Sequence, residues 1–481
     1  MPALVPDVDL ATFTRVSDFL TAIRLQARRP TYPITRQLDI HGITVDDGAQ
    51  FLLPLIIHLD QHPETEPEHN IPLSPGIVSC SLIRSKALFF KLGHRVRLGL
   101  QEWSGGEVSF GPGPERAVHR RSMELLAEDR HFWQQAPNSR FSVPRFTPGD
   151  VDIPARHARF KAYGSLLAIH CYTLGTAPLP VSIWLLYALC MGPSAMLMRK
   201  QYLAALDPDA FNCLAAWFTL APSDPIPTHF MHPFNQFLLN VMDLEPAIIG
   251  SPQTQEVHDS WTTLFMSKVL FNDEGIWKRA EFESLGSGFR VAFGNSNFVR
   301  ELTRHPPVLP LLARLYDREI RDVEDISSRL DFTILMSASD DTTPYYGALF
   351  RVLLLRYLDG VGHPAELCGG LVSDGDFNKV LNDTCLRAGL LLEVATDSNI
   401  MPGSDTWLIK WRFVGLDSGS MEVSPRPLHF HTCTYEVDVK ITPALQDVLL
   451  ASCVNLDDPT HATPFDLWLH SQLLSRDHNT A

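Results

Sequence analysis

Hydrophobic residues in the middle of the chain recur at the spacing of one helical face. Phe160, Tyr163, Leu167 and Cys171 are three to four residues apart, and Gly175 follows where helices favour glycine as a C-cap. This pattern predicts a helix that buries one side and ends near residue 175.

The same region contains a long uncharged run, residues 163–198, without Lys, Arg, Asp or Glu. A membrane span needs ~20 predominantly apolar residues. Gly175, Pro178, Pro180 and Pro193 interrupt the run, and proline removes a backbone donor that a continuing helix requires. We therefore expect two short buried helices joined by a turn, and no membrane partner.

Two further helices are indicated by their first residues or their periodicity. Asp207 can accept hydrogen bonds from the free N–H groups of a helix start, and Pro208 suits the first helical position. Residues 348–358, "ALFRVLLLRYL", have the apolar content and spacing of a buried helix.

Beyond residue 400 the pattern changes to strict alternation. Trp407, Ile409 and Trp411 alternate with residues of the opposite face, which predicts a half-buried strand. Residues 431–441, "HTCTYEVDVKI", also alternate, and we expect a second strand with its odd positions on the apolar side. Thr442 then has the position of a helix N-cap.

These elements predict an α+β fold with two parts. The first part is long and mainly helical, and the second is a mixed α/β tail of about 140 residues, near the usual domain size. The break is expected at residues 334–347, "ILMSASDDTTPYYG", because this stretch is polar and has no strong periodicity.

Composition narrows the classes of function. The chain has 481 residues, 45% hydrophobic and 20% charged, which is typical of a globular protein too long for one core. Its formal charge of −15 argues against nucleic acid as a partner, because that role needs a basic surface. Eight scattered cysteines without a CxxC pair favour a reducing compartment, and the N-terminus lacks the pattern of a signal peptide. We expect an intracellular protein of the cytoplasm or nucleus.

Four segments stand in an order and approximate spacing that one protein family shares. They are Phe160, Gly164 and Ala168 followed by "LDPDAF" (206–211), then "FESLGSGFRVAFG" (282–294), "LLLRYLDGVGHP" (353–364) and "HFHTCTYEVDVKI" (429–441). Together they resemble the HECT family of ubiquitin–protein ligases, from about residue 37 to about residue 455, and the chain is similar to a divergent member.

The resemblance implies a bilobal architecture and a set of partners. It implies an N-terminal segment (1–36), a mainly helical N-lobe (37–333), a hinge (334–347) and a mixed C-lobe (348–481). Within the N-lobe, residues 196–265 correspond to the docking subdomain for a ubiquitin-conjugating enzyme. The expected partners are ubiquitin, this enzyme and an unidentified protein substrate, without cofactor or metal.

The resemblance also implies that Cys433 is the catalytic residue. A thiolate suits this role because it takes the ubiquitin acyl group from another thioester and then releases it to a lysine amine. The hydroxyls of Thr432 and Thr434 could support the developing oxyanion, and His431 could assist proton movement.

Other interpretations of the same segment remain open. The alternation alone favours Cys433 as a small buried side chain, because free cysteine is among the most buried residue types. His429, His431 and Cys433 could also point one way as three zinc ligands. Residue 434 is not the family's usual Phe, and residues 221–265 lack the usual docking signature. A catalytically inactive HECT-like binding or scaffold module is therefore the alternative.

Overall fold

The computed structural model describes residues 37–61, 72–83, 95–98, 109–110, 112–146, 153–250, 252–293, 296–304, 308–316, 319–334, 342–367, 370–396, 398–402, 407–414, 427–432, 434–453 and 461–475. The chain divides into two compact units. The first comprises Met1–Asp39, Asp46–His94 and His119–Asp317, and the second comprises Ile40–Val45, Arg95–Val118 and Arg318–Ala481. Helices dominate and the sheets are small, so the predicted α+β class is confirmed.

Helices account for most of the described residues up to residue 316. They are α2 (Val45–Gln61), α3 (Pro112–Glu128), α4 (Ile153–Leu174), α5 (Ile183–Met191), α6 (Lys200–Leu206), α7 (Pro208–Phe218), α8 (Pro233–Phe237), α9 (Gln255–Phe271), α10 (Ala280–Phe289), α11 (Phe298–Arg304) and α12 (Val308–Tyr316). The short strands β1 (Gln37–Gly42), β2 (Ile77–Ile83), β3 (Arg95–Leu98) and β4 (Ser109–Phe110) form one sheet in the order β2-β1-β3-β4. Two hairpins pair β5 (Trp133–Gln135) with β6 (Ser142–Pro144) and β7 (Ala292–Phe293) with β8 (Ser296–Asn297).

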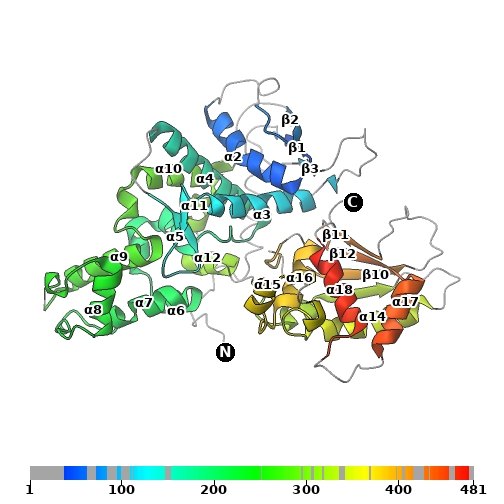
Figure 1. The fold of residues 1–481 in the computed structure, drawn as a ribbon. Helices are drawn as coiled ribbons and strands as arrows, with labels where there is room; N and C mark the ends of the chain where they lie inside the picture. The colour runs from blue at the N-terminus through cyan, green and yellow to red at the C-terminus, as the bar shows by residue number, and fades with distance from the viewer. Residues whose placement is uncertain are drawn as a thin grey trace. The chain divides into compact units, whose positions relative to one another are not determined.

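Two glycines let helices α4 and α10 cross backbone to backbone. A Cβ atom added at Gly164 would lie 1.9 Å from the carbonyl oxygen of Leu285, and one added at Gly288 would lie 1.8 Å from that of Lys161. Both distances are far below van der Waals contact, so only glycine allows this approach. Gly164 and Gly288 lie in two of the segments that carry the resemblance. Figure 1 shows the two helices, α4 and α10, next to each other.

The uncharged run forms the expected pair of helices. Helix α4 ends as predicted: Gly175 has a φ of 69°, and its N–H donates to the carbonyl oxygen of Cys171 at 3.1 Å. A turn with a cis Leu179–Pro180 bond leads to α5. In the described part of the chain, no helix combines the length and apolar character needed to cross a membrane.

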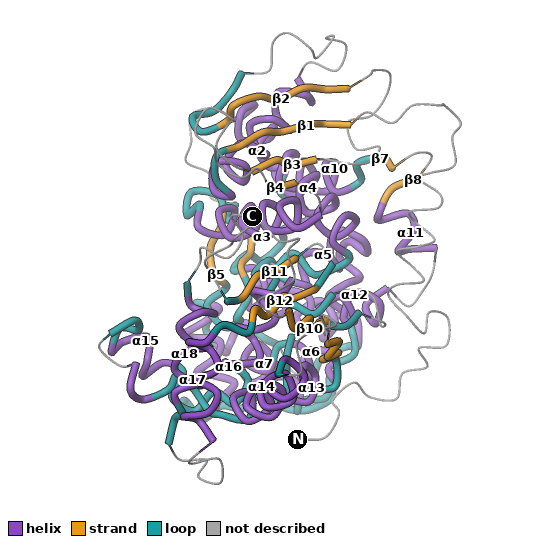
Figure 2. The backbone as a smooth tube through the Cα atoms, turned by 90° about the vertical axis from the view of Figure 1, so that its right-hand side faces the viewer, coloured by secondary structure: helices purple, strands orange, loops and turns teal. Residues whose placement is uncertain are grey.

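The second unit is a four-stranded sheet with helices. Its elements from residue 318 onward are α13 (Glu324–Ser327), β9 (Leu330–Ile334), α14 (Thr343–Leu358), α15 (Asp374–Lys379), α16 (Leu386–Thr396), β10 (Ile409–Val414), β11 (Leu428–His431), β12 (Glu436–Lys440), α17 (Pro443–Ser452) and α18 (Pro464–Leu474). The strand order is β11-β12-β10-β9, with β9 and β12 parallel to β10 and β11 antiparallel to β12. Figure 2 labels β11, β12 and β10 as neighbouring orange segments of this sheet.

The alternation of β10 explains how this sheet is covered. Ile409, Trp411 and Phe413 are fully buried, whereas Lys410 is exposed. The buried face packs against α14, α16, α17 and α18 in one apolar core, with Trp411 at 0% exposure. The predicted helix starts at Asp207 and Thr442 are confirmed, because the two side chains accept hydrogen bonds from the N–H groups of Ala210 and Leu445.

The two-unit division differs in position from the predicted lobes. The C-terminal part of the second unit starts at Arg318, and β9, which ends at the first residue of the predicted hinge at 334–347, is a strand of its sheet. Residues 335–341 of that predicted hinge lie outside the described residues. The HECT-like lobes and the hinge therefore stay predictions.

Candidate functional site

The segment around residue 433 is a hairpin and not the single strand predicted over 431–441. Strand β11 ends at His431, β12 begins at Glu436, and these two residues are paired antiparallel. Cys433 itself lies outside the described residues. The prediction of one strand was wrong because the chain reverses between His431 and Glu436, where Tyr435 has a φ of 57° in the left-handed region.

The hairpin changes which side chains share a face. On β12, Val437 and Val439 enter the core, but on β11 the buried positions are Leu428 and Phe430. His431 therefore lies on the polar face of the sheet. The single strand predicted over 431–441 would instead have placed His431 on the apolar face, together with the other odd-numbered residues.

On this polar face His431 binds a buried carboxylate. Its Nε2 lies 2.9 Å from Oδ2 of Asp438, and the Asp438 side chain is only 5% exposed. Arg412 donates to the same carboxylate twice, from Nε to Oδ1 at 2.6 Å and from Nη2 to Oδ2 at 3.0 Å. Burial alone would raise the pKa of Asp438, but the hydrogen bonds from His431 and Arg412 outweigh it and lower that pKa below its ordinary value.

The two predicted threonines differ in their surroundings. Thr432 is buried, whereas Thr434 is exposed and its hydroxyl and N–H both lie near the carbonyl oxygen of His431, at 3.4 and 3.1 Å. Arg116, from the part of α3 that belongs to the same unit, donates to the Thr432 carbonyl oxygen and to the Tyr435 hydroxyl at 2.9 Å. This cation fixes both ends of the turn.

Sequence reasoning identified His431 but missed Asp438 and Arg412. Asp438 had the position of an ordinary solvent-facing residue in an alternating strand, and Arg412 lies 26 residues away along the chain. A signal existed in the phase of the pattern: Phe430 is apolar at an even position, whereas Val437 and Val439 are apolar at odd positions. Such a phase change indicates a turn between them.

The thiols of three other cysteines are unsuited to nucleophilic chemistry. Cys171 is fully buried, and burial raises the pKa of its thiol. Burial also raises the pKa of Cys190 to about 12 and that of Cys213 to about 11. These groups stay protonated near neutral pH, as expected for cysteines on the core side of helices.

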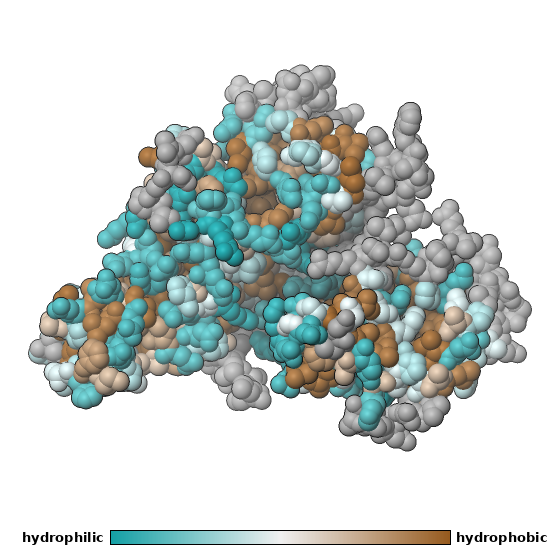
Figure 3. Space-filling view, in the orientation of Figure 1, coloured by the Kyte–Doolittle hydropathy of each residue, from teal (hydrophilic) through white to brown (hydrophobic). Residues whose placement is uncertain are grey.

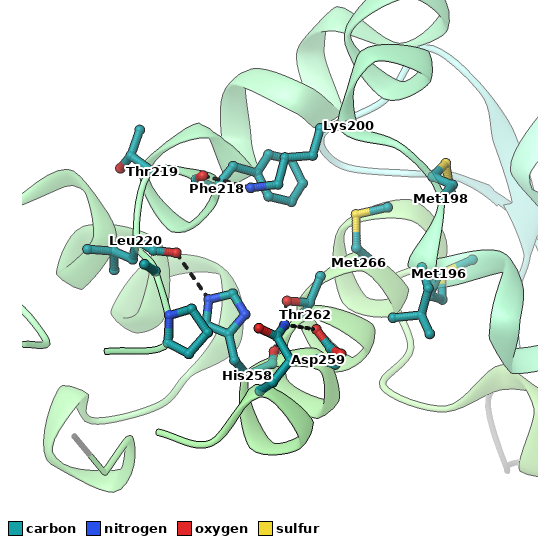
Figure 4. Close-up of a pocket in the computed structure, with 14 residues that line it drawn as sticks. Met196, Met198, Lys200, Phe218, Thr219, Leu220, His258, Asp259, Thr262 and Met266 are labelled. Atoms are coloured by element: carbon teal, nitrogen blue, oxygen red, sulfur yellow. Dashed lines mark hydrogen bonds between the residues drawn. The ribbon is translucent and has the colours of Figure 1, made fainter. Parts of the chain in front are cut away.

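The predicted docking segment, residues 196–265, contains a hollow of its own. A cavity of about 550 Å³ lies between the 3-10 helix Gly192–Leu197, the start of α6, the end of α7 and helix α9. Three methionines line it: Met196, Met198 and Met266 (Figure 4). Methionine side chains are flexible and polarizable, and they adapt to partners of different shape.

Polar groups frame the opposite side of this cavity. Lys200 Nζ donates to the carbonyl oxygen of Phe218 at 2.7 Å and lies 4.8 Å from the centre of the Phe218 ring. Burial lowers the pKa of Lys200 below its ordinary value. His258 Nε2 lies 3.1 Å from the carbonyl oxygen of Leu220, and its ring stacks on Trp217 at 4.3 Å.

The same segment exposes two apolar side chains on a loop that is fixed by hydrogen bonds. Phe230 is 64% exposed and Met231 is 67% exposed. Asn235, itself buried, donates to the carbonyl oxygens of Pro227 and His229, both at 2.9 Å. Figure 3 shows apolar side chains at the surface over this α8–α9 end of the first unit.

Comparison of the chain with models of protein families and with curated proteins found none that matches.

Proposed function

We propose that this protein is a ubiquitin–protein transferase of the HECT type, which accepts ubiquitin as a thioester on Cys433 and passes it to a substrate lysine. The observation that carries the proposal is the network of His431, Asp438 and Arg412, in which His431 stands two residues before that cysteine in the sequence. A histidine bound to a buried carboxylate is a proton carrier of the kind that acyl transfer to an amine requires. The four ordered segments supply the choice of ubiquitin as the acyl group.

The first step needs little from the protein beyond position and access. Exchange of one thioester for another forms a C–S bond and breaks a C–S bond, so it is nearly thermoneutral and positioning dominates. Thr432 and Thr434 flank Cys433 in the sequence, and we assign their polar groups the role of supporting the oxyanion. The proposed reaction needs no cofactor. We propose the cytoplasm or nucleus as its place in the cell.

The methionine-lined cavity and the Phe230–Met231 loop support the docking of a conjugating enzyme within residues 196–265. Leu197 lines the cavity and is 57% exposed. Leu197→Asp should therefore weaken the binding of the conjugating enzyme while the stability of the fold changes little. Leu371, 64% exposed in the second unit, provides the control variant Leu371→Asp. Pull-down with a panel of charged conjugating enzymes measures the difference.

The transferase activity is tested by trapping the intermediate. Incubation with activating enzyme, conjugating enzyme and ubiquitin should give an adduct that a thiol reductant removes. Cys433→Ala should abolish the adduct, whereas Cys385→Ala should retain it, because burial raises the pKa of the Cys385 thiol above its ordinary value. The proposal is overturned if this protein forms no ubiquitin adduct with any of the conjugating enzymes tested. It is also overturned if the adduct still forms in Cys433→Ala.

An inactive HECT-like binding module is the second candidate. It is favoured by the cavity and the exposed loop, which suit protein docking whether or not catalysis follows. Retained conjugating-enzyme binding without any reductant-sensitive adduct would support this candidate over the first.

A further inference from the structure

Three side chains of the second unit that the proposed reaction does not use form one hydrogen-bond chain. The Tyr357 hydroxyl lies 2.6 Å from Nδ1 of His470, and Nε2 of His470 lies 2.7 Å from Nδ1 of His363. Tyr357 is on α14, His470 is on α18, and His363 is on the turn that follows α14. The chain therefore joins α18 both to α14 and to this turn.

We propose that this chain is a pH-sensitive switch, which holds the second half of α18, residues 468–474, against α14 at neutral pH and releases it in mild acid. Tyr357 and His470 are fully buried, whereas His363 is half-buried. The chain thus has one end at the surface, where a proton can arrive from solvent, and the other end in the core. The switch is independent of the proposed transferase activity and adds a regulatory property to the second unit.

Burial decides which atoms of the chain carry the hydrogens. Burial raises the pKa of Tyr357, so its hydroxyl hydrogen stays in place. Among the described residues, Nδ1 of His470 is the one acceptor that this hydroxyl reaches. His470 then carries its own hydrogen on Nε2 and donates to Nδ1 of His363. In this neutral arrangement both buried donors of the chain are satisfied.

One added proton disturbs this arrangement. A proton on Nδ1 of His363 must donate to Nε2 of His470, whose own hydrogen then moves to Nδ1 and points at the Tyr357 oxygen. A proton on His470 has the same result, because both of its nitrogens then donate. In either case the Tyr357 hydrogen has no acceptor among the described residues, and an unpaired donor in a core is unfavourable. The closed arrangement therefore resists protonation.

The charges that face His363 come from α15 and α16. Burial and the guanidinium of Arg387 on α16 lower the pKa of His363 below its ordinary value, and the carboxylate of Asp376 on α15 opposes them. Asp376 is also bound by Lys379 and by the hydroxyl of Ser373, each at 2.8 Å. Its negative charge is therefore shared, and the fold disfavours a protonated His363.

His470 contributes the larger part of the pH dependence. Burial, together with the charges of His363 and Arg387, lowers the pKa of His470 to about 3. The carboxylates on the neighbouring elements are engaged elsewhere, because Asp466 is paired with Arg356 of α14 and Glu366 acts on Arg387. In released α18 the imidazole reaches water, and its pKa returns to the ordinary value of about 6.5. The closed form is thus fully favoured above pH 6.5 and loses this advantage as the pH falls below it.

The turn that carries His363 is fixed, so α18 is the element that moves. Arg387 donates from Nε to the carbonyl oxygen of Gly362 at 2.9 Å and from Nη1 to that of Tyr357 at 3.1 Å. The His363 ring also stacks on Phe377 of α15, with 6.3 Å between the ring centres. These contacts hold the turn whether or not His470 is in place.

The first turn of α18 is fixed as well. Thr463 and Asp466 form a capping box, and Asp466 is paired with Arg356. His470 follows one turn later, where Leu469 and Leu473 supply the buried apolar contacts. Release therefore concerns the second half of the helix, residues 468–474.

The size of the effect follows from the two pKa values of His470. A change from pH 7.5 to pH 5.5 adds a proton to most released molecules, but the closed form, with a pKa of about 3, stays neutral. The equilibrium constant for release should then rise on the order of tenfold. His363 changes it in the same direction.

Amide hydrogen exchange measures this equilibrium. Protection factors at pH 7.5 and 5.5, corrected for the intrinsic exchange rate at each pH, are compared for α18 and for β10 of the same unit. The amides of residues 468–474 should lose protection on the order of tenfold at the lower pH. At pH 5.5 they should also be less protected than those of β10, because the helix opens without the sheet.

His470→Gln is the decisive variant. Glutamine can accept from the Tyr357 hydroxyl with Oε1 and donate to His363 with Nε2, but it does not titrate. Protection of α18 at pH 7.5 should stay close to that of wild type, and most of the loss at pH 5.5 should disappear. His461→Gln replaces an exposed histidine just before α18 and is the matched control, which should keep the loss.

Tyr357→Phe tests the proton arrangement separately. It removes the hydrogen that protonation leaves unpaired, so the pKa of His363, measured from the NMR signal of its ring, should rise toward 6.5. A hydroxyl that served packing alone would leave this pKa unchanged.

The switch is overturned if the protection of residues 468–474 is the same at both pH values, or if it falls equally in wild type and His470→Gln. It is also overturned if α18 and β10 are equally protected at pH 5.5, because the helix then opens only with the whole unit. If His470→Gln fails to fold, the pKa of His363 in Tyr357→Phe decides: a rise supports the switch, and an unchanged value overturns it.

Discussion

The crossing of α4 and α10 gives the sharpest test of the fold. In Gly164→Ala the new Cβ would start 1.9 Å from the Leu285 carbonyl oxygen, and the helices would have to separate by about 1.5 Å to restore a contact of 3.4 Å. Overpacking of this kind costs ~1–3 kcal/mol. The neighbour is backbone and cannot rotate away, so the upper end applies. Alanine is more favourable than glycine inside a helix by ~1 kcal/mol. The free energy of unfolding should therefore fall by about 2 kcal/mol in total.

A matched control lies on the partner helix. Gly286 is also in α10, but a Cβ there would meet the end of the Arg290 side chain at 3.3 Å and Leu189 at 3.6 Å. Gly286→Ala should therefore be neutral or slightly stabilising. In thermal unfolding, Gly164→Ala should lower the melting temperature by roughly 4–8 °C, because 1 kcal/mol corresponds to about 2–4 °C for a unit of this size. Equal melting temperatures for both variants would refute the close helix crossing.

Three further changes in stability are expected, two at buried groups and one at a glycine with open space beside it. Asp466 is 1% exposed and paired with Arg356, so Arg356→Ala should lower the free energy of unfolding by ~3–5 kcal/mol in urea titration, because it leaves a buried charge unpaired; a loss below 1 kcal/mol would contradict the pairing. Burial lowers the pKa of His170 to about 4 and that of His470 to about 3, so below their ordinary pKa of about 6.5 the unfolded chain binds protons that the folded chain does not. Stability should then fall by about 2 kcal/mol per histidine between pH 7 and 5, and urea midpoints that do not change over this range would count against these burials. Gly389 in α16 has no atom within 4 Å of an added Cβ, so Gly389→Ala should stabilise by ~0.4–1 kcal/mol; a lower melting temperature would show that this space is filled.

Local signals in the sequence predicted individual elements well. The Gly175 cap, the helix starts at Asp207 and Thr442 and the alternation of β10 depend on neighbouring residues only. Such features follow from backbone geometry and hydrogen bonding within one turn. They were therefore visible without knowledge of the rest of the chain.

Features that depend on distant partners were not visible. The turn between β11 and β12 was hidden because threonine and tyrosine fit an extended strand, and the left-handed Tyr435 depends on contacts such as that from Arg116. The Asp438 carboxylate is held by Arg412, which lies on β10. A pattern along one strand cannot show which residues a neighbouring strand brings alongside.

In the proposed reaction, Cys433 is the residue to which ubiquitin becomes attached. After brief incubation with the activating and conjugating enzymes, intact-mass measurement should show one ubiquitin added to this chain, and hydroxylamine should release it. Peptide mapping at low pH should place the acyl group on the fragment that contains Cys433. An acyl group found on another cysteine, or a bond that resists hydroxylamine, would contradict the account.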